Sequence, residues 1–488
     1  MKSLEARKTK IVATIGPASR SPQLMEKLLK AGVNVVRLNF SHGTHEVHGQ
    51  VIKNIRDIAG KLNMPVAIML DLQGPKIRIG KLKEGSIELT HGQTIFITAE
   101  NPDGDDSLIS TTYQNLYKDV KPGDRLLFDD GLLEVRVRKI SGKKIECEVV
   151  YGGTLKEHKG INLPGVNISA PCLTEKDIED LNFGIENGVD YIALSFVRKP
   201  SDISELKERL KAKDADISVI AKIEKAEAIV NLDAIMEESD GIMIARGDLG
   251  VELSTEAVPV LQKKIISKAN EAGKTVITAT QMLESMISNP RPTRAEASDV
   301  ANAVFDGTDA LMLSGETAVG SYPVESVEVM VRIATEAEEA ALAQKYLLRR
   351  KKGDAGSFTQ AVCFAAAAAS NEVSSKAIVV FTQSGETAKI LSKLRPHTPI
   401  VAFTVLEKTW RKLALLWGVQ PFLGEFGEHT DEMICRGEAA LLDYGIADWG
   451  DTVVVVSGTK VGMRGATNMM KIDWIGSEEC KLYLKGKN

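Results

Sequence analysis

The residues best suited to chemistry are a lysine and two carboxylates that end two short apolar segments. Lys222 and Glu224 alternate in Lys222-Ile-Glu224, and Asp248 ends Arg246-Gly-Asp248. If both segments are strands, their period-two geometry places Lys222 and Glu224 on one face. Two carboxylates on adjacent strands can converge on one hard cation such as Mg2+ or Mn2+ and leave positions open for water and substrate oxygens. An ammonium beside that metal suits a transferring phosphoryl group, whose charge is neutralised by cations positioned in advance.

Each of these residues also has a purely structural interpretation. A carboxylate after a strand often caps the next helix, and a lysine beside a carboxylate often forms only a salt bridge. Polar residues recur, however, at the ends of the other expected strands, which argues against this interpretation for the whole set. These strand ends are Arg37 to His42, Asp71, Ser195, Thr278 to Gln281 and Ser314 to Glu316.

The common nucleotide-binding loops do not occur in the sequence. There is no P-loop. No two glycines are separated by exactly one residue, so the motif G-x-G-x-x-G cannot occur. The net charge of −5 gives no reason to expect a nucleic acid partner. If the protein binds a phosphate, it does so at a local site and through groups other than these glycine-rich loops.

Composition predicts a multidomain globular protein of the cytoplasm. The chain has 488 residues, 43% hydrophobic and 26% charged, which suggests two to four domains. Neither a signal peptide nor an apolar run of bilayer length is visible. The five cysteines are odd in number and scattered without paired spacing, which predicts reduced thiols. They are Cys147, Cys172, Cys363, Cys435 and Cys480.

The chemistry-bearing segments sit on an alternation of expected strands and helices. Three strands precede residue 74 and five follow residue 171, each with a helical segment after it, and no repeat other than this βα period is apparent. Eight such units favour an α/β fold of the TIM (β/α)8 barrel type, although the pattern alone leaves an open doubly wound sheet possible. In a TIM barrel the active site lies at the C-terminal ends of the strands. The expected strands are 10–16, 33–41, 65–72, 189–196, 217–224, 240–248, 275–281 and 309–314.

Two further domains are expected. Residues 74–171 consist of short strands with turn punctuation, which indicates an all-β lid domain inserted into a catalytic barrel of residues 1–73 and 172–348. The expected strands of this domain are 86–89, 94–98, 125–128, 132–139 and 144–150. A basic, glycine-containing stretch at 349–356 reads as a linker. Beyond it, residues 357–488 alternate strands, expected at 377–382, 399–404 and 452–457, with helices and predict an open α/β domain with a regulatory role.

Several long motifs, in order from about residue 8 to 323, resemble the pyruvate kinase family. They are Arg37-Leu-Asn-Phe-Ser-His-Gly43, Asp71 with Gly74-Pro75, Lys222-Ile-Glu224, Ala245-Arg-Gly-Asp-Leu-Gly250, Ala279-Thr-Gln-Met-Leu-Glu-Ser285, Pro290-Arg-Pro-Thr-Arg-Ala-Glu296 and Met312-Leu-Ser-Gly-Glu-Thr-Ala318. The resemblance implies phosphoryl transfer from phosphoenolpyruvate to ADP, giving pyruvate and ATP in the last step of glycolysis. It also implies a homotetramer whose subunits have a barrel, a lid and a C-terminal regulatory domain.

The resemblance also assigns roles to individual residues. Glu224 and Asp248 look like the Mg2+ ligands, and Lys222 looks like the cation that stabilises the phosphoryl group in flight. Substrate contacts fall on Arg37, Ser195, Lys222, Ala245, Arg246, Gly247, Asp248 and Thr280. Thr280 also falls on the proton path to the enolate. Nucleotide contacts fall on Asn39, His42, Arg78 and Lys159.

A phosphate-binding loop is expected in the C-terminal domain. Thr382, Ser384, Gly385 and Thr387 follow a strand and open a helix, so hydroxyl and N-H groups could hold one phosphate of an allosteric activator. A plain helix cap is the alternative. Glu386 within the loop should repel a bisphosphate such as fructose 1,6-bisphosphate, while Lys460 and Arg464 could still serve a sugar or nucleotide monophosphate.

Potassium is expected to be dispensable. In potassium-dependent relatives the monovalent cation is bound by positions that correspond to Asn39, Ser41, Asp71 and the carbonyl of Leu72, and a glutamate stands where this chain has Lys76. A fixed ammonium can supply the positive potential of that cation, about 3 kcal/mol per charge pair at about 5 Å and a dielectric near 20. The alternative is that Lys76 points to solvent as a hinge residue of the lid.

Two other functions compete with this interpretation. A metal-dependent aldolase or carboxylase on the same barrel also holds a pyruvate enolate with a Glu and Asp pair, but needs no nucleotide lid. A catalytically silent scaffold would be expected to lack Lys222, Glu224 or Asp248, and the chain keeps all three.

Overall fold

The structure is a computed structural model that describes residues 7–82, 84–100, 103–104, 107–343, 357–459, 467–478 and 480–481. The linker expected at 349–356, and with it Lys460 and Arg464, lies outside these residues. The chain divides into two compact units. One holds the chain up to Leu70, Glu186–Ile192 and everything from Ile266 onward, and the other holds Asp71–Ile185 and Ala193–Ile265. Within the described ranges no helix combines the length and apolarity needed to cross a membrane.

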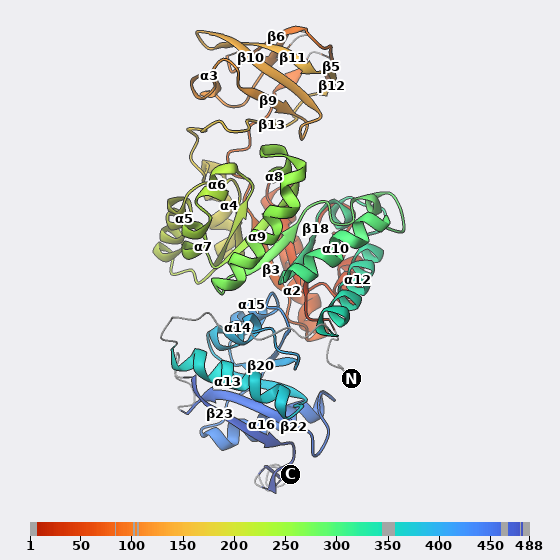
Figure 1. The fold of residues 1–488 in the computed structure, drawn as a ribbon, viewed down its shortest axis with the longest axis vertical. Helices are drawn as coiled ribbons and strands as arrows, with labels where there is room; N and C mark the ends of the chain where they lie inside the picture. The colour runs from red at the N-terminus through yellow and green to blue at the C-terminus, as the bar shows by residue number, and fades with distance from the viewer. Residues whose placement is uncertain are drawn as a thin grey trace. The chain divides into compact units, whose positions relative to one another are not determined.

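Eight strands form a closed barrel in the order β1-β18-β17-β16-β15-β14-β3-β2, which confirms the predicted TIM barrel (Figure 1). Every residue of β1, β3, β16 and β17 is buried, as expected for strands that are covered on both faces. The strands are β1 (Lys10–Thr14), β2 (Val35–Asn39), β3 (Ala67–Asp71), β14 (Tyr191–Leu194), β15 (Ser218–Ile223), β16 (Gly241–Ala245), β17 (Thr275–Ala279) and β18 (Ala310–Leu313).

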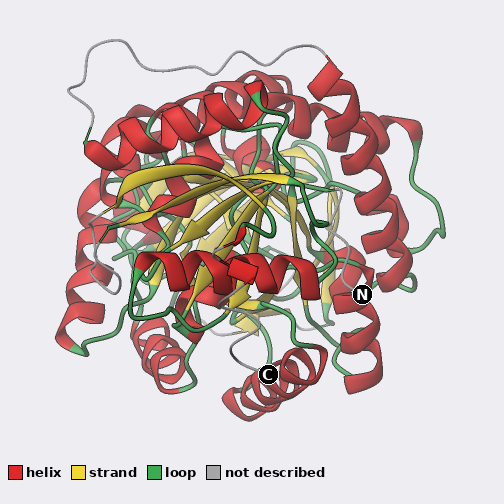
Figure 2. Cartoon of the chain, turned by 90° about the horizontal axis from the view of Figure 1, so that it is seen from below, coloured by secondary structure: helices red, strands yellow, loops and turns green. Residues whose placement is uncertain are grey.

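The helices that alternate with these strands are drawn in red in Figure 2, and several begin at a side-chain cap. The hydroxyls of Ser21 and Thr44 accept N-H groups of the first turn, and Thr293 with Glu296 forms a capping box. The helices are α1 (Pro22–Ala31), α2 (His45–Leu62), α4 (Glu175–Glu186), α5 (Pro200–Ala212), α6 (Ala226–Val230), α7 (Leu232–Glu238), α8 (Arg246–Glu252), α9 (Val258–Glu271), α10 (Arg294–Asp306), α11 (Gly315–Ala318) and α12 (Pro323–Ala343), with 3-10 turns at Thr255–Ala257 and Glu284–Ile287.

An asparagine or aspartate stands directly before every second barrel strand and clamps it to the strand that precedes it in the chain. The side chain accepts the N-H of that strand's second residue, and the carbonyl of the same residue accepts the backbone N-H of the clamping residue. The pairs are Asn34 with Ile11, Asp190 with Ile68, Asp240 with Val219 and Asp309 with Val276, with side-chain distances of 3.0, 2.8, 2.7 and 2.7 Å. The barrel therefore repeats in (βα)2 units, a period that the sequence analysis missed.

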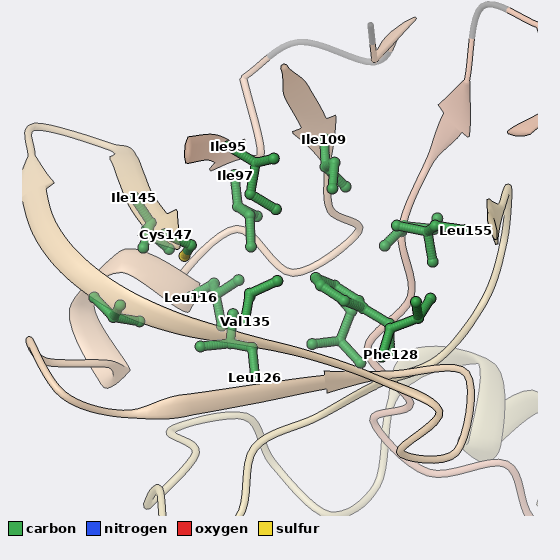
Figure 3. Close-up of a cluster of buried hydrophobic side chains, with 14 of the residues drawn as sticks. Ile95, Ile97, Ile109, Leu116, Leu126, Phe128, Val135, Ile145, Cys147 and Leu155 are labelled. Carbon is green, nitrogen blue, oxygen red and sulfur yellow. The ribbon is translucent and has the colours of Figure 1, made fainter. Parts of the chain in front are cut away.

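The inserted segment forms a six-stranded sheet in the order β13-β9-β10-β11-β6-β8, with small pairs β12-β5 and β4-β7. One face of the sheet buries an apolar cluster that includes Ile95, Phe128 and Val135, whose side chains point toward one another in Figure 3. The elements are β4 (Lys81–Leu82), β5 (Ser86–Leu89), β6 (Thr94–Thr98), β7 (Asp103–Gly104), β8 (Leu108–Ser110), α3 (Leu116–Asp119), β9 (Arg125–Phe128), β10 (Leu133–Ser141), β11 (Lys144–Tyr151), β12 (Gly153–Lys156) and β13 (Ile161–Asn162).

The C-terminal part is an open α/β domain, as predicted, with the strand order β21-β20-β19-β22-β23. Separate apolar clusters cover its two faces, one around Val380 and Leu391 and one around Phe381 and Met433. Two strands that the sequence analysis did not predict, β21 and β23, form the sheet edges. The elements are α13 (Phe358–Glu372), β19 (Ala377–Phe381), α14 (Glu386–Lys393), β20 (Ile400–Thr404), α15 (Glu407–Leu413), β21 (Val419–Leu423), α16 (Thr430–Asp443), β22 (Thr452–Gly458) and β23 (Thr467–Trp474).

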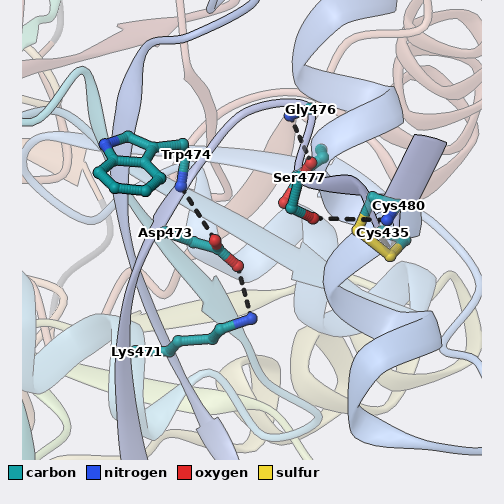
Figure 4. Close-up of a disulfide and its surroundings, with 8 residues drawn as sticks. Cys435, Lys471, Asp473, Trp474, Gly476, Ser477 and Cys480 are labelled. Atoms are coloured by element: carbon teal, nitrogen blue, oxygen red, sulfur yellow. Dashed lines mark hydrogen bonds and ion pairs between the residues drawn. A yellow bond between two sulfur atoms is a disulfide. The ribbon is translucent and has the colours of Figure 1, made fainter.

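The prediction that all thiols are reduced is wrong for one pair. Cys435 on α16 and Cys480 form a disulfide across a sequence separation of 45 residues (Figure 4). Their spacing in the sequence does not indicate the pairing, because only the folding of the C-terminal domain brings the two cysteines together. The other cysteines are buried free thiols, and burial raises the pKa of Cys147 and of Cys363 to about 12.

Candidate active site

Lys222 lies at the centre of a buried polar cluster at the end of β15. Its Nζ is 2.8 Å from Glu224 Oε1, 2.7 Å from Ser195 Oγ and 3.2 Å from Asp71 Oδ1. Lys222 and Glu224 therefore share one face, as the period-two pattern predicted. Because Lys222 is only 9% exposed and its ammonium contacts three oxygens, the ammonium is held in one position before any substrate arrives.

The partners of Lys222 are themselves fixed. Ser195 Oγ donates to the Leu72 carbonyl at 2.7 Å, and Glu224 Oε2 accepts the N-H of Phe196 at 2.9 Å. Phe196 has a left-handed backbone, with φ of 57°, which is unfavourable for an aromatic residue and is typical of sites where geometry is imposed for function. The sequence analysis missed Phe196, because its contribution is a backbone N-H that no residue type reveals.

Asp248 belongs to the same unit but not to a strand. It lies in the first turn of α8, directly after β16, so the expected strand 240–248 ends earlier than predicted. Burial, followed by the charge of Glu224, raises the pKa of Asp248 to about 6, while the charges of Lys222 and Lys76 oppose this shift. The carboxylate pair thus carries excess negative charge in a dry environment, which is what a divalent cation would neutralise.

The donor set fits a hard divalent metal with few protein ligands. Among the described residues no three His, Cys, Asp or Glu side chains gather into a metal-binding cluster. The carboxylates of Glu224 and Asp248 would offer oxygen ligands of the kind that such an ion prefers, with water and substrate oxygens completing its coordination.

Other charged residues near this cluster have structural partners. Arg246 is buried and its Nη1 donates to Gln262 Oε1 at 3.3 Å. Lys225, next to Glu224, forms a buried ion pair with Glu252. Asp177, which the sequence analysis did not single out, accepts the N-H of Gly74 at 3.0 Å and so anchors the chain where the inserted domain begins.

The candidate nucleotide residues of the inserted domain are held within it. Lys159 pairs with Asp129 at 2.7 Å, and Arg78 Nη1 donates to the His158 carbonyl at 3.0 Å. Both cations remain partly exposed, so a polyphosphate could compete for them.

The remaining candidate residues belong to the other compact unit and are described by themselves. Arg37 is buried at β2, with Nη1 3.0 Å from Thr14 Oγ1. Asn39 Oδ1 accepts the Ser41 N-H at 3.1 Å, and the His42 carbonyl lies 2.8 Å from His48 Nε2.

Two consecutive residues after β17 have left-handed backbones. The φ angles are 67° at Thr280 and 52° at Gln281, and the Thr280 hydroxyl donates to the Ala279 carbonyl at 2.6 Å. Such strain at a candidate substrate-binding residue again marks an imposed geometry. After β18, in contrast, Glu316 accepts the N-H groups of Leu283 and Ser314, which is a structural role.

A barrel that holds a carboxylate pair beside a buried, preorganised lysine suits the class of metal-assisted phosphoryl-transfer enzymes. Comparison with known proteins narrows the class. Residues 6–327 match the family described as pyruvate kinase, barrel domain, and residues 360–473 match pyruvate kinase, alpha/beta domain.

Individual relatives agree with both matches. The pyruvate kinases of Staphylococcus aureus strains MRSA252 and USA300 are each 49% identical over 474 residues, which covers 97% of this chain and 81% of theirs. A crystal structure of a pyruvate kinase from Cryptosporidium parvum superposes with a TM-score of 0.88 at 38% identity and covers 97% of both chains. This chain belongs to the pyruvate kinase family. It is a phosphotransferase that converts phosphoenolpyruvate and ADP to pyruvate and ATP.

Proposed function

We propose that Lys222 is the cation that neutralises the phosphoryl group between the enol oxygen and ADP. The supporting observation is its set of three oxygen contacts at 2.7 to 3.2 Å, which a phosphoryl oxygen can replace without moving the ammonium far. A metal held by Glu224 and Asp248 would supply further positive charge to the phosphoryl oxygens. Ser195 and the Phe196 N-H keep the lysine and Glu224 in place.

The remaining roles concern binding and proton delivery. Arg37 binds the substrate phosphate, and Thr280 with the Ala245 to Gly247 backbone binds the substrate carboxylate. The hydroxyl of Thr280 belongs to the proton path to the enolate carbon. Because the enol then becomes a ketone, transfer is driven towards ATP. Asn39, His42, Arg78 and Lys159 bind the nucleotide.

Metal titrations test the ligand assignment. Glu224→Gln and Asp248→Asn should each raise the Mn2+ concentration needed for half-maximal activity by tenfold or more, and direct Mn2+ binding by electron paramagnetic resonance should weaken in parallel. An unchanged titration in both variants would refute it.

We propose that the enzyme works without potassium because Lys76 supplies the missing charge. Lys76 is exposed and forms no ion pair with another residue in the described part of the chain, yet its charge opposes the rise in the pKa of Asp248. Its positive potential therefore reaches the metal-binding carboxylates. The chain keeps polar groups at the other positions that bind the monovalent cation in potassium-dependent relatives, which are Asn39, Ser41, Asp71 and the carbonyl of Leu72.

Initial rates in tetramethylammonium buffer, with and without KCl at constant ionic strength, test this proposal. The wild type should be stimulated less than twofold, and Lys76→Glu should acquire a strong potassium requirement. Strong stimulation of the wild type, or a Lys76→Glu variant indifferent to potassium, would contradict it.

We propose that a sugar or nucleotide monophosphate activates the enzyme at the loop before α14. In this loop Thr382 Oγ1 accepts the Gly385 N-H at 2.9 Å, and Thr387 shares a buried hydrogen bond of 2.7 Å with Thr467. Glu386 begins the helix and disfavours a second phosphate. Strong activation by fructose 1,6-bisphosphate, with none by ribose 5-phosphate or AMP, would show that the reasoning is wrong.

We propose a homotetramer in the cytoplasm. One feature that favours self-association is β23, an edge strand on which Ile472 and Trp474 are 46% and 69% exposed. Light scattering should give four times the mass of 52.9 kDa, and Trp474→Lys should reduce it. Cell fractionation tests the location.

A further inference from the structure

The C-terminal domain contains a cavity of 460 Å³ that lies at the ends of three parallel strands and against helix α16. Its volume falls within the range of small-molecule sites. The phosphate-binding loop and the barrel contribute no residue to its lining. The lining residues are Phe381, Phe403, Leu423, Gly424, Glu425, Arg436, Gly437, Ala440, Asp443 and Tyr444.

Aromatic rings provide the apolar part of the cavity. Phe381 is the last residue of β19 and Phe403 the last but one of β20, and their rings stack with centroids 5.4 Å apart at 20°. Tyr444 packs at 4.7 Å on Phe422, which adjoins the site on β21. On α16, Gly437 faces Phe381 so closely that a Cβ would lie 2.7 Å from its Cζ. The wall is therefore a preformed aromatic surface, suited to a compact apolar body.

The polar part of the cavity carries excess negative charge. Arg436 Nη1 lies 2.9 Å from Glu425 Oε2, and its Nη2 lies 2.8 Å from Glu432 Oε1. One guanidinium is thus shared by two carboxylates. Asp443, at the end of α16, has no ion-pair partner within the described ranges. A ligand would meet an uncompensated carboxylate beside aromatic rings.

We propose that this cavity binds a small organic cation, an ammonium group on an aryl or similarly compact apolar body. The apolar body fills the aromatic part, and the ammonium pairs with Asp443. Aromatic faces add to the preference for a cation, because their quadrupoles attract positive charge. An anion of the same shape is repelled by Asp443 and Glu425.

A charge series on the full-length enzyme tests the proposal. Isothermal titration calorimetry at constant ionic strength compares 2-phenylethylamine, 2-phenylethanol and phenylacetate, which share a phenyl ring and differ in charge. The amine should bind at least tenfold more tightly than the alcohol, with phenylacetate weakest. Equal or tighter binding of the alcohol or the acid, or no binding of the amine at millimolar concentration, would overturn the proposal.

Four variants place the binding at this cavity. Asp443→Asn should remove the preference for the amine over the alcohol, whereas Asp431→Asn, on the same helix but outside the lining, should leave it intact. Ala440→Leu should fill the cavity and weaken all three probes, whereas Ala439→Leu should not. Unchanged circular dichroism and pyruvate formation show that each variant is folded. A folded Asp443→Asn or Ala440→Leu variant that binds the amine as the wild type does would refute the site.

Discussion

Lys393 and Asp309 form a buried ion pair, with Nζ 2.5 Å from Oδ2, that joins the end of helix α14 to the residue before barrel strand β18. Arg395 adds a second contact to Asp309 at 2.8 Å. Burial alone would raise the pKa of Asp309, but the charges of Lys393 and Arg395 lower it. Since Asp309 also clamps Val276, one carboxylate connects helix α14 with two barrel strands.

Replacement of this carboxylate should be costly for a specific reason. Asp309→Asn keeps an oxygen for the Val276 N-H, as Asn34 does for Ile11, but leaves the buried ammonium of Lys393 and the partly buried guanidinium of Arg395 without their counter-ion. We expect a loss of about 3 to 5 kcal/mol in the free energy of unfolding, measured in urea.

Asp240→Asn is the matched control. Asp240 clamps Val219 in the same way, but its cationic partner Lys207 is 36% exposed. We expect a loss below about 1 kcal/mol. Equal losses in both variants would mean that the buried ion pair of Asp309 contributes no more stability than the exposed ion pair of Asp240.

Lys222→Ala should lower turnover by roughly 100- to 1000-fold, because it removes one preorganised charge that acts in the transition state. Mn2+ binding should be preserved, since the two carboxylates remain. Steady-state kinetics and Mn2+ titration measure the two effects separately. Retention of more than a tenth of wild-type turnover would exclude Lys222 from the chemistry.

Stability at alkaline pH should reveal the buried Lys8. Burial, with only partial compensation by Glu338, lowers the pKa of Lys8 to about 8, and its Nζ donates to the carbonyls of Pro396 and His397. Between this value and the unfolded value near 10.5, the unfolded state binds more protons, so stability rises with pH.

The difference in unfolding free energy between the wild type and Lys8→Met should therefore grow in favour of the wild type by about 2 kcal/mol from pH 8 to pH 10. The subtraction cancels groups common to both proteins. A difference that stays flat or falls would contradict the assigned shift.

Reduction of the Cys435–Cys480 disulfide should loosen the C-terminal domain. Loss of a cross-link that spans a sequence separation of 45 residues is expected to cost about 2 to 4 kcal/mol. Dithiothreitol should lower the Tm of the wild type and leave a Cys435→Ala/Cys480→Ala double variant unchanged. The same shift in the double variant would assign the effect to something other than this bond.

The sequence predicts those parts of the fold that depend on local signals. Strands Ser86–Leu89, Thr94–Thr98 and Arg125–Phe128 have the predicted bounds, because apolar alternation and turn residues are read within a few positions. The two missed strands, β21 and β23, are sheet edges, where partial exposure weakens the pattern, and β21 contains Pro421, which edge strands tolerate.

The candidate site likewise contains parts that local sequence patterns predict and parts that they do not. Side chains at strand ends, such as Lys222 and Glu224, could be found from residue type and period. The N-H of Phe196, the left-handed backbone at Thr280 and the disulfide depend on contacts between distant segments, and no local pattern encodes them. The sequence singled out Asp248 but placed it on a strand, because the short helix α8 begins directly after β16 and no residue pattern marks the boundary.

The clamps before every second strand also explain where the barrel accepts extra sequence. The inserted domain interrupts the pair β3 and β14, yet Asp190 still reaches Ile68 across 122 positions of the chain. The clamping residue Asp190 follows the insertion in the chain and bonds to β3, the strand before the insertion. The contact between the two paired strands therefore forms whatever sequence lies between them. For protein engineering, we therefore expect the loop after the first strand of each pair to accept an inserted domain, provided that the clamping residue is retained.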